Sequence, residues 1–176
     1  MYTLARGRLR EMITLRCTKK LLARLGATRP AKNEPAETPP TTRLGDWHAN
    51  VLYRPNAELV LFVNDRSLLP VVVPARPTDI VAMRLVEALA TTLLRLGASP
   101  RAVEAEIAEM TVVQIGPTRS RQILGSMTDF DNLLDHRLEP GRTLIDAGLE
   151  LAAAPCGPIG MRRPRDVAIE LLALGG

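Results

Sequence analysis

The centre of the chain holds three strand-like runs separated by very short connections, and this spacing most constrains the fold. The runs cover residues 47–54, 58–64 and 68–74. Their separators, Pro55-Asn56-Ala57 and Asp65-Arg66-Ser67, both contain residues that are typical of tight turns. Because such short connections join antiparallel neighbours, the sequence predicts a meander over residues 47–74.

Helical periodicity dominates the chain after this meander. Apolar residues recur at helical spacing over residues 79–96, and Ser99-Pro100 is a typical start for a second helix that extends to Met110. The further segments expected are strands at 12–17 and 111–115, a short helix at 19–25, and helices from Ser126, near 143–153 and near 165–174. Early strands followed by helices indicate an α+β fold, a small antiparallel sheet covered by helices.

The ends and one inner stretch set the expected domain limits. Residues 1–11 are Arg-rich without apolar periodicity, so we expect a disordered or non-native extension there. Residues 28–43 are rich in Pro and Thr and poor in apolar side chains, which predicts a mobile loop. The remainder, residues 12–176, fits a single domain of ordinary size.

Charge is distributed unevenly along the chain. Residues 1–30 have a net charge of +7, whereas the whole chain has +4. A basic end on a weakly acidic body is typical either of a phosphate contact or of a solvated helix face. Aromatic residues make up only 3% of the chain, which disfavours single-strand binding by base stacking.

The sequence also predicts a compartment. It shows no signal peptide pattern and no apolar run long enough to span a membrane, and its two cysteines, Cys17 and Cys156, lie far apart. We therefore expect a cytoplasmic protein with reduced thiols and no membrane contact.

The segment Leu44-Gly45-Asp46-Trp47-His48-Ala49-Asn50-Val51-Leu52 contains the polar cluster that most resembles a site. At strand spacing, Asp46, His48 and Asn50 share one face, and Trp47 lies on the other with Ala49 and Val51. We expect Trp47 to be buried against the helical stripe of residues 79–96. The polar face is either a binding site or the solvated side of a half-buried strand.

His48 is the candidate for a catalytic residue. A histidine beside a carboxylate suits general acid–base work, and nearby arginines would hold a phosphate, as in RNA cleavage without a metal. The solvated-strand interpretation competes with this one and is favoured, so the sequence leans away from an enzyme. The predicted binding residues are Asp46, Asn50, Arg119, Arg121, Lys19 and Lys20.

The sequence favours no cofactor. Cys17, Cys156, His48 and His136 show none of the close spacings of a structural zinc site, so no metal is expected. No phosphate-binding glycine loop and no hydrolase nucleophile motif is present.

Several blocks in order resemble an uncharacterised bacterial family of single-domain proteins. The blocks are MITLRCTKKLL at residues 12–22, LGDWHANVL at 44–52, LVLFVN at 59–64, SRQILGSMTDF at 120–130 and PCGPIG at 155–160. The family typically has LGDWYAN and SRSVLGSMND, so His48 stands in place of Tyr and Thr128 in place of Asn. The resemblance implies a domain that begins near Met12 and implies no activity. A Tyr at the position of His48 also speaks against a shared catalytic base.

Together these features predict a binding or regulatory module that acts through the polar face of residues 44–52. The alternative is a small RNA-binding or metal-independent RNA-cleaving protein of toxin–antitoxin type. The partner would be a protein in the first case and RNA in the second.

Overall fold

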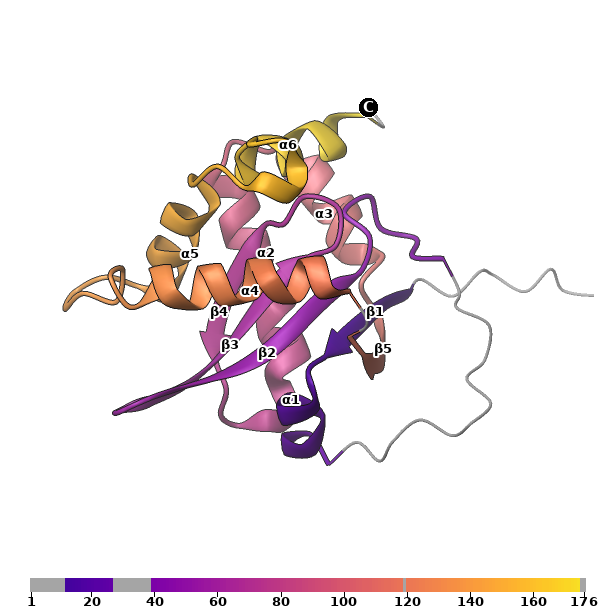
Figure 1. Cartoon of the computed structure of the whole chain (residues 1–176). Helices are drawn as coiled ribbons and strands as arrows, with labels where there is room; N and C mark the ends of the chain where they lie inside the picture. The colour runs from indigo at the N-terminus through magenta and orange to yellow at the C-terminus, as the bar shows by residue number, and fades with distance from the viewer. Residues whose placement is uncertain (1–11, 27–38, 119, 175–176) are drawn as a thin grey trace, which may run out of the picture.

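The computed structural model describes residues 12–26, 39–118 and 120–174, and the α+β class is confirmed (Figure 1). The predicted meander is present as three strands, β2 (Trp47–Arg54), β3 (Ala57–Asn64) and β4 (Pro70–Pro74). The other elements are β1 (Met12–Cys17), α1 (Lys19–Arg24), α2 (Val81–Arg95), α3 (Pro100–Ala108), β5 (Val112–Pro117), α4 (Arg121–Leu134), α5 (Leu144–Ala152) and α6 (Pro164–Ala173), with short 3-10 turns at Thr78–Ile80 and Gly157–Ile159.

The sheet is larger than the meander and is mixed rather than purely antiparallel. Its five strands lie in the order β4-β3-β2-β1-β5, and β1 pairs in parallel with both β2 and β5. In this register Arg16 lies beside His48 on one side and beside Gly116 on the other. The parallel pairing places the first described strand in the interior of the sheet.

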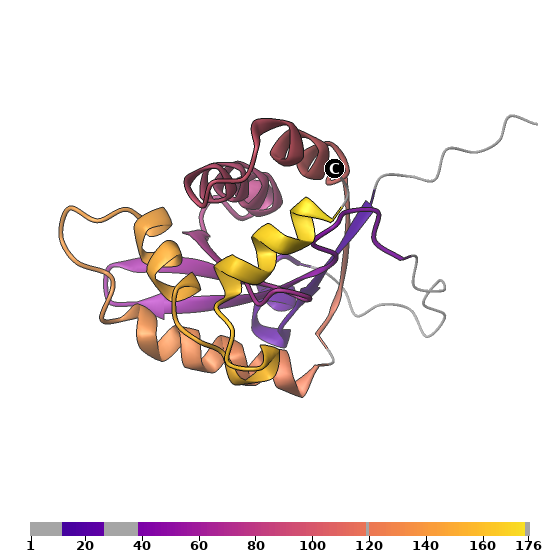
Figure 2. The ribbon, with the colours of Figure 1, turned by 90° about the horizontal axis from the view of Figure 1, so that it is seen from above.

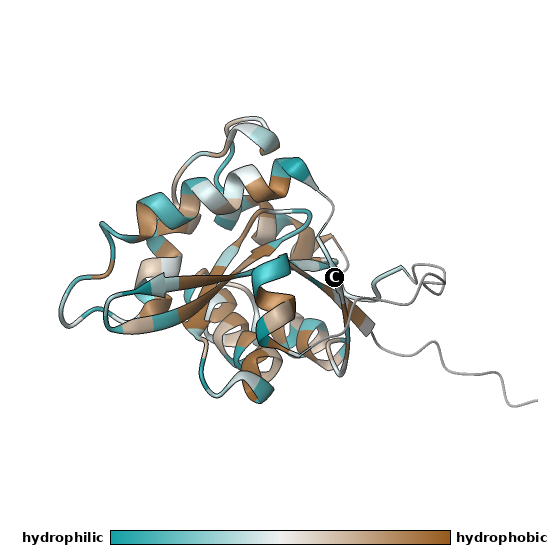
Figure 3. Ribbon diagram, turned by 60° about the horizontal axis from the view of Figure 1, so that its bottom comes forward, coloured by the Kyte–Doolittle hydropathy of each residue, from teal (hydrophilic) through white to brown (hydrophobic). Residues whose placement is uncertain are grey.

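Helices cover both faces of the sheet, as Figure 2 shows from above. On one face the β1 and β2 residues Ile13, Leu15 and Trp47 join a buried cluster with side chains of α2, α3 and α6. On the other face, side chains of β3 pack with those of α4 and α5 in a second cluster. Figure 3 shows hydrophobic and hydrophilic segments alternating along the helices around the sheet. Burial of this apolar surface is the main stabilising term of the fold.

Helix α2 forms as the periodicity predicts. Val81, Leu85, Leu89 and Leu93 are buried and recur every four residues, so one stripe of the helix faces the sheet. Gly97, with φ +91°, follows the last turn in a conformation that favours glycine. The predicted cap at Ser99 is also confirmed, because its hydroxyl accepts a hydrogen bond from the Ala102 amide.

The predicted start of the next helix at Ser126 is wrong. Helix α4 begins at Arg121, and Ser120 is its N-cap because its Oγ accepts a 3.2 Å hydrogen bond from the Ile123 amide. Ser126 lies inside the helix and donates to the Gln122 carbonyl. The apolar stripe of α4 already includes Ile123, so burial extends the helix through Gly125.

The part of the predicted mobile loop that the structure describes, residues 39–43, is tied to the core at its end. Thr42 is buried, and the buried Glu106 accepts hydrogen bonds from the amides of Arg43 and Leu44. Residues 28–38 of that prediction, and the predicted extension at 1–11, lie outside the described residues. In the described parts of the chain, no helix is both long and apolar enough to cross a membrane.

Candidate functional site

The alternation predicted for residues 46–51 places their side chains correctly. His48 pairs with Val63 and Asn50 with Leu61, so both polar residues share the sheet face that α4 packs on. Trp47 lies on the opposite face and is fully buried in the cluster that contains Leu85. The strand therefore separates an apolar face from a polar one, as the sequence indicated.

Asp46 fastens β1 to the start of β2. Its Oδ1 accepts a 2.9 Å hydrogen bond from the Thr14 amide, and its Oδ2 lies 3.1 Å from Arg16 Nη2 in an ion pair. Gly45, immediately before it, has φ +81°, and a Cβ at this position would come within 2.8 Å of Arg66 Nε. The positive φ of the turn that presents Asp46 to β1 favours glycine, and the flexible Arg66 side chain lies directly against this position.

Asn64, at the end of β3, holds the same turn from the other side. Its Nδ2 donates to the carbonyls of Leu44 and Asp46, and its Oδ1 accepts from Ser67 and from the Arg66 amide. Because Asn64 is fully buried, these bonds are needed to satisfy its amide. They fix the start of the polar face relative to the β3–β4 connection.

His48 is buried, which differs from the solvated strand residue that the sequence favoured. Its exposed fraction is 1%, its Nδ1 lies 2.8 Å from Thr118 Oγ1, and its Nε2 lies 3.3 Å from Asp65 Oδ1. The bond to His48 is the main reason why the pKa of Asp65 lies below its usual value. Both ring nitrogens are thus engaged by residues of the chain itself, and the ring joins three segments that are distant in sequence.

Asn50 joins β2 to the start of α1. Thr18 Oγ1 donates a 2.7 Å hydrogen bond to Asn50 Oδ1, and the Thr18 amide donates to the Ala49 carbonyl. Thr18 is also the N-cap of α1, so this bond sets the position of the first helical turn. Lys19 and Lys20 occupy that turn and are exposed.

The two segments that precede the predicted basic residues of α1 and α4 lie side by side at this end of the sheet. The Thr118 amide donates to the Cys17 carbonyl, which brings the segment before α4 alongside the segment before α1. Arg121, the first residue of α4, is exposed there. Arg119 lies outside the described residues, so its predicted role stays a prediction.

We define the polar half-face as the part of the α4-side sheet face that carries Thr14, Arg16, His48, Asn50, Gln114 and Gly116, of which His48 is buried. Figure 1 shows α4 crossing in front of β2 and β3, with β1 and β5 beyond its N-terminal end. Among the described residues, neither β1 nor β5 contributes a side chain to the apolar cluster under α4 and α5. Gln114 is exposed, and Thr14, Arg16 and Asn50 are partly exposed.

Metal and thiol chemistry find little support in the described residues. No three side chains of His, Cys, Asp or Glu among them are grouped so that they could hold a metal ion. Burial raises the pKa of Cys17 to about 12, and it also raises the pKa of Cys156. Because the thiolate is the reactive form, neither cysteine is activated as a nucleophile in this structure.

The sequence did not predict four residues that bond to Asp46, His48 or Asn50, which are Arg16, Thr18, Asp65 and Thr118. The signal for Arg16 was present, because Thr14 and Arg16 alternate with the buried Ile13, Leu15 and Cys17. No local pattern marks Asp65 or Thr118, since only the folded chain brings them to His48.

Comparison with known proteins gives a family and no activity. Residues 14–167 match the model of a domain of unknown function (DUF6933). This match confirms the resemblance to an uncharacterised family that the sequence blocks indicated. No match was found among curated proteins.

Proposed function

The chain belongs to the DUF6933 family of domains of unknown function, and we propose that it is a binding module whose contact surface is the polar half-face. The observation that carries this proposal is the contrast within one sheet face. Helices α4 and α5 cover the β3–β4 side with apolar side chains, whereas the β1–β5 side presents polar groups beyond the end of α4.

The polar half-face is organised in advance for contact. Arg16 is held by Asp46, Asn50 by Thr18, and His48 by Thr118 and Asp65. A surface whose side chains are already ordered loses little conformational entropy when a partner binds. This supports recognition of a defined partner rather than loose contact.

The rim of this surface is basic. Lys19, Lys20 and Arg121 are exposed around the end where β1 and β5 meet the N-terminal end of α4. Complementary charge would steer an acidic partner to this rim and fix its orientation. We therefore propose that the partner is an acidic segment of another protein.

RNA is the second candidate, and the same basic rim favours it together with the +7 net charge of residues 1–30. The 3% aromatic content favours a protein partner over RNA, because base stacking needs aromatic side chains. Cleavage is less well supported than binding, since His48 is buried and engaged at both nitrogens.

A direct test compares two labelled probes, a poly-glutamate peptide and a single-stranded RNA of equal length, by fluorescence anisotropy. We expect saturable binding of the peptide that weakens with salt. The double variant Lys20→Glu/Arg121→Glu should bind about tenfold more weakly, as two exposed charges of up to about 1 kcal/mol each imply. Arg163→Glu, a single reversal of an exposed charge at the start of α6, is the control for position and should leave affinity unchanged.

Tighter binding of RNA than of the peptide would favour the second candidate. Equal effects of the double variant and the control would contradict the proposed surface. Incubation with mixed cellular RNA tests cleavage. RNA cleavage that resists a chelator and disappears in His48→Ala would overturn the binding-module proposal in favour of an enzyme.

A further inference from the structure

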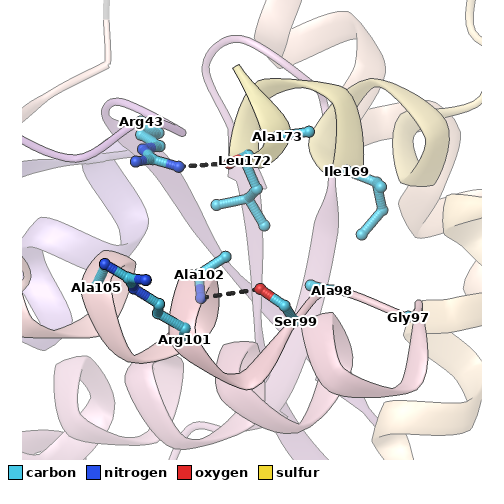
Figure 4. A pocket seen from close by; sticks show the side chains of 10 residues that line it. All are labelled: Arg43, Gly97, Ala98, Ser99, Arg101, Ala102, Ala105, Ile169, Leu172 and Ala173. Carbon is cyan, nitrogen blue, oxygen red and sulfur yellow. Dashed lines mark hydrogen bonds between the residues drawn. The ribbon is translucent and has the colours of Figure 1, made fainter. Parts of the chain in front are cut away.

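A cavity of about 530 Å³ lies between α3 and α6, and it is separate from the polar half-face (Figure 4). Its volume falls within the range of roughly 300–1,000 Å³ that small-molecule sites occupy. The residues that line it are Arg43, Gly97, Ala98, Ser99, Arg101, Ala102, Ala105, Ile169, Leu172 and Ala173.

The walls of this cavity are apolar. Ile169 and Leu172 extend from α6, while Ala98, Ala102 and Ala105 line the side of α3 and the turn before it. The short alanine side chains leave the space between the two helices open. Such walls suit a hydrocarbon group, whose burial is favourable in proportion to the area removed from water.

One end of the cavity is positively charged. Figure 4 shows the guanidinium groups of Arg43 and Arg101 toward the same end, with Ile169 and Ala98 toward the other. Arg43 donates a hydrogen bond to the Leu172 carbonyl at the C-terminal end of α6. Arg101 is exposed and forms no ion pair with any residue that the structure describes.

We propose that this cavity binds a small amphipathic carboxylate. The carboxylate lies against Arg101, with Arg43 as a second positive group, and the hydrocarbon part lies between α3 and α6. A planar guanidinium presents a fork of N–H donors that matches both carboxylate oxygens. The polarised cavity, basic at one end and apolar along its walls, is the observation that selects this class of ligand.

Octanoate is a suitable probe. 1-Octanol, which lacks the carboxylate, is the control for charge, and acetate, which lacks the long chain, is the control for the hydrocarbon part. Titration of the full chain is followed by calorimetry and by amide chemical shifts. We expect saturable binding of octanoate, at least about tenfold tighter than either control. The shifted amides should belong to residues 97–105 and 169–173.

Two substitutions at exposed positions test separately the contribution of the Arg101 charge and that of the cavity volume. Arg101→Ala should weaken octanoate about tenfold and leave octanol unchanged. Ala105→Leu fills the cavity and should weaken both ligands. Arg163→Ala and Ala108→Leu are the controls, at exposed positions that do not line the cavity, and should bind octanoate as the unmodified chain does.

Three results would overturn the proposal: octanol binding as tightly as octanoate, octanoate affinity unchanged in both Arg101→Ala and Ala105→Leu, or no saturable binding of octanoate. Thermal unfolding of each variant shows whether the fold is retained. Because the variants replace exposed residues outside the polar half-face, failure of this test leaves the proposed function untouched.

Discussion

The two halves of the sheet face that carries α4 differ in how they are held together. On the half formed mainly by β3 and β4, Leu61, Val63 and Val72 are buried under α4 and α5. On the polar half-face, Arg16, His48 and Asn50 are bonded to side chains from neighbouring segments. The first half is stabilised by non-directional burial, and the second by directional bonds with fixed geometry.

This difference explains why α4 and α5 cover only the β3–β4 half of this sheet face. Burial rewards any apolar helix stripe in proportion to its area, so α4 lies where the strand residues are apolar. Covering Arg16 or Asn50 with apolar side chains would instead remove polar groups from water, which is costly unless every bond is replaced. The polar half-face therefore lies outside the apolar cluster of α4 and α5, at the cost of burying less apolar surface.

The largest effect is expected in the covered half. Phe130→Ala in α4 removes a fully packed aromatic ring and should lower the free energy of unfolding by about 3–5 kcal/mol. Urea denaturation measures this loss. Leu133→Ala in the same helix is the control, because Leu133 is 38% exposed and its loss should cost much less. Equal losses in the two variants would break the contrast between covered and open surface.

Asp46→Ala should have the next largest effect. It leaves the Thr14 amide without the Asp46 acceptor and removes the ion pair between Arg16 and Asp46, and we expect a loss of about 1–3 kcal/mol. Asp46→Asn keeps an oxygen for the Thr14 amide and should lose less, as measured by the same denaturation. A larger loss in the Asn variant than in the Ala variant would contradict the role assigned to the hydrogen bond.

A smaller effect is expected for the bond between Thr18 and Asn50, at about 0.5–1.5 kcal/mol. Thr18 also caps α1, so single variants mix two contributions. A double-mutant cycle with Thr18→Ala and Asn50→Ala isolates the pair. A coupling energy of zero would show that the half-face is not held by this bond.

The smallest effect concerns the stability of the fold at acid pH. Because the folded pKa of Asp65 lies below its usual value of 3.8, its contact with His48 adds stability above that value. That contribution is lost as the pH falls through the folded pKa. Asp65→Asn should therefore lose less stability than the unmodified chain between neutral pH and pH values below the folded pKa. Because the Asp65 side chain is about half exposed, solvent screening keeps the difference small. Identical pH dependence in both proteins would remove Asp65 from the network.

The sequence predicted the features that depend on neighbours in the chain. The turn residues near Asn56 and Arg66 predicted the meander, and the spacing of Leu85 and Leu89 predicted α2. The start of α4 was placed too late, because Ser120 and Ser126 have equal capping chemistry and only the buried position of Ile123 distinguishes them.

The candidate site was harder to predict than the fold. The shared face of His48 and Asn50 followed from strand alternation and is confirmed, whereas Asp46 lies just before β2 and bonds to Arg16. The burial of His48 was missed, since its partners Asp65 and Thr118 lie 17 and 70 residues away in sequence. Local periodicity contains no information about such contacts.

The interior position of β1 has a consequence for how the chain acquires its structure. Met12 is registered with Val112, so one side of β1 is completed only by residues about a hundred positions later. Closing so long a loop carries an entropic cost, and non-local pairing of this kind slows folding. During synthesis β1 is made before β5, so the backbone edge of β1 that pairs with β5 stays unpaired until β5 has been made. That interval is when an edge strand is most open to pairing with another chain.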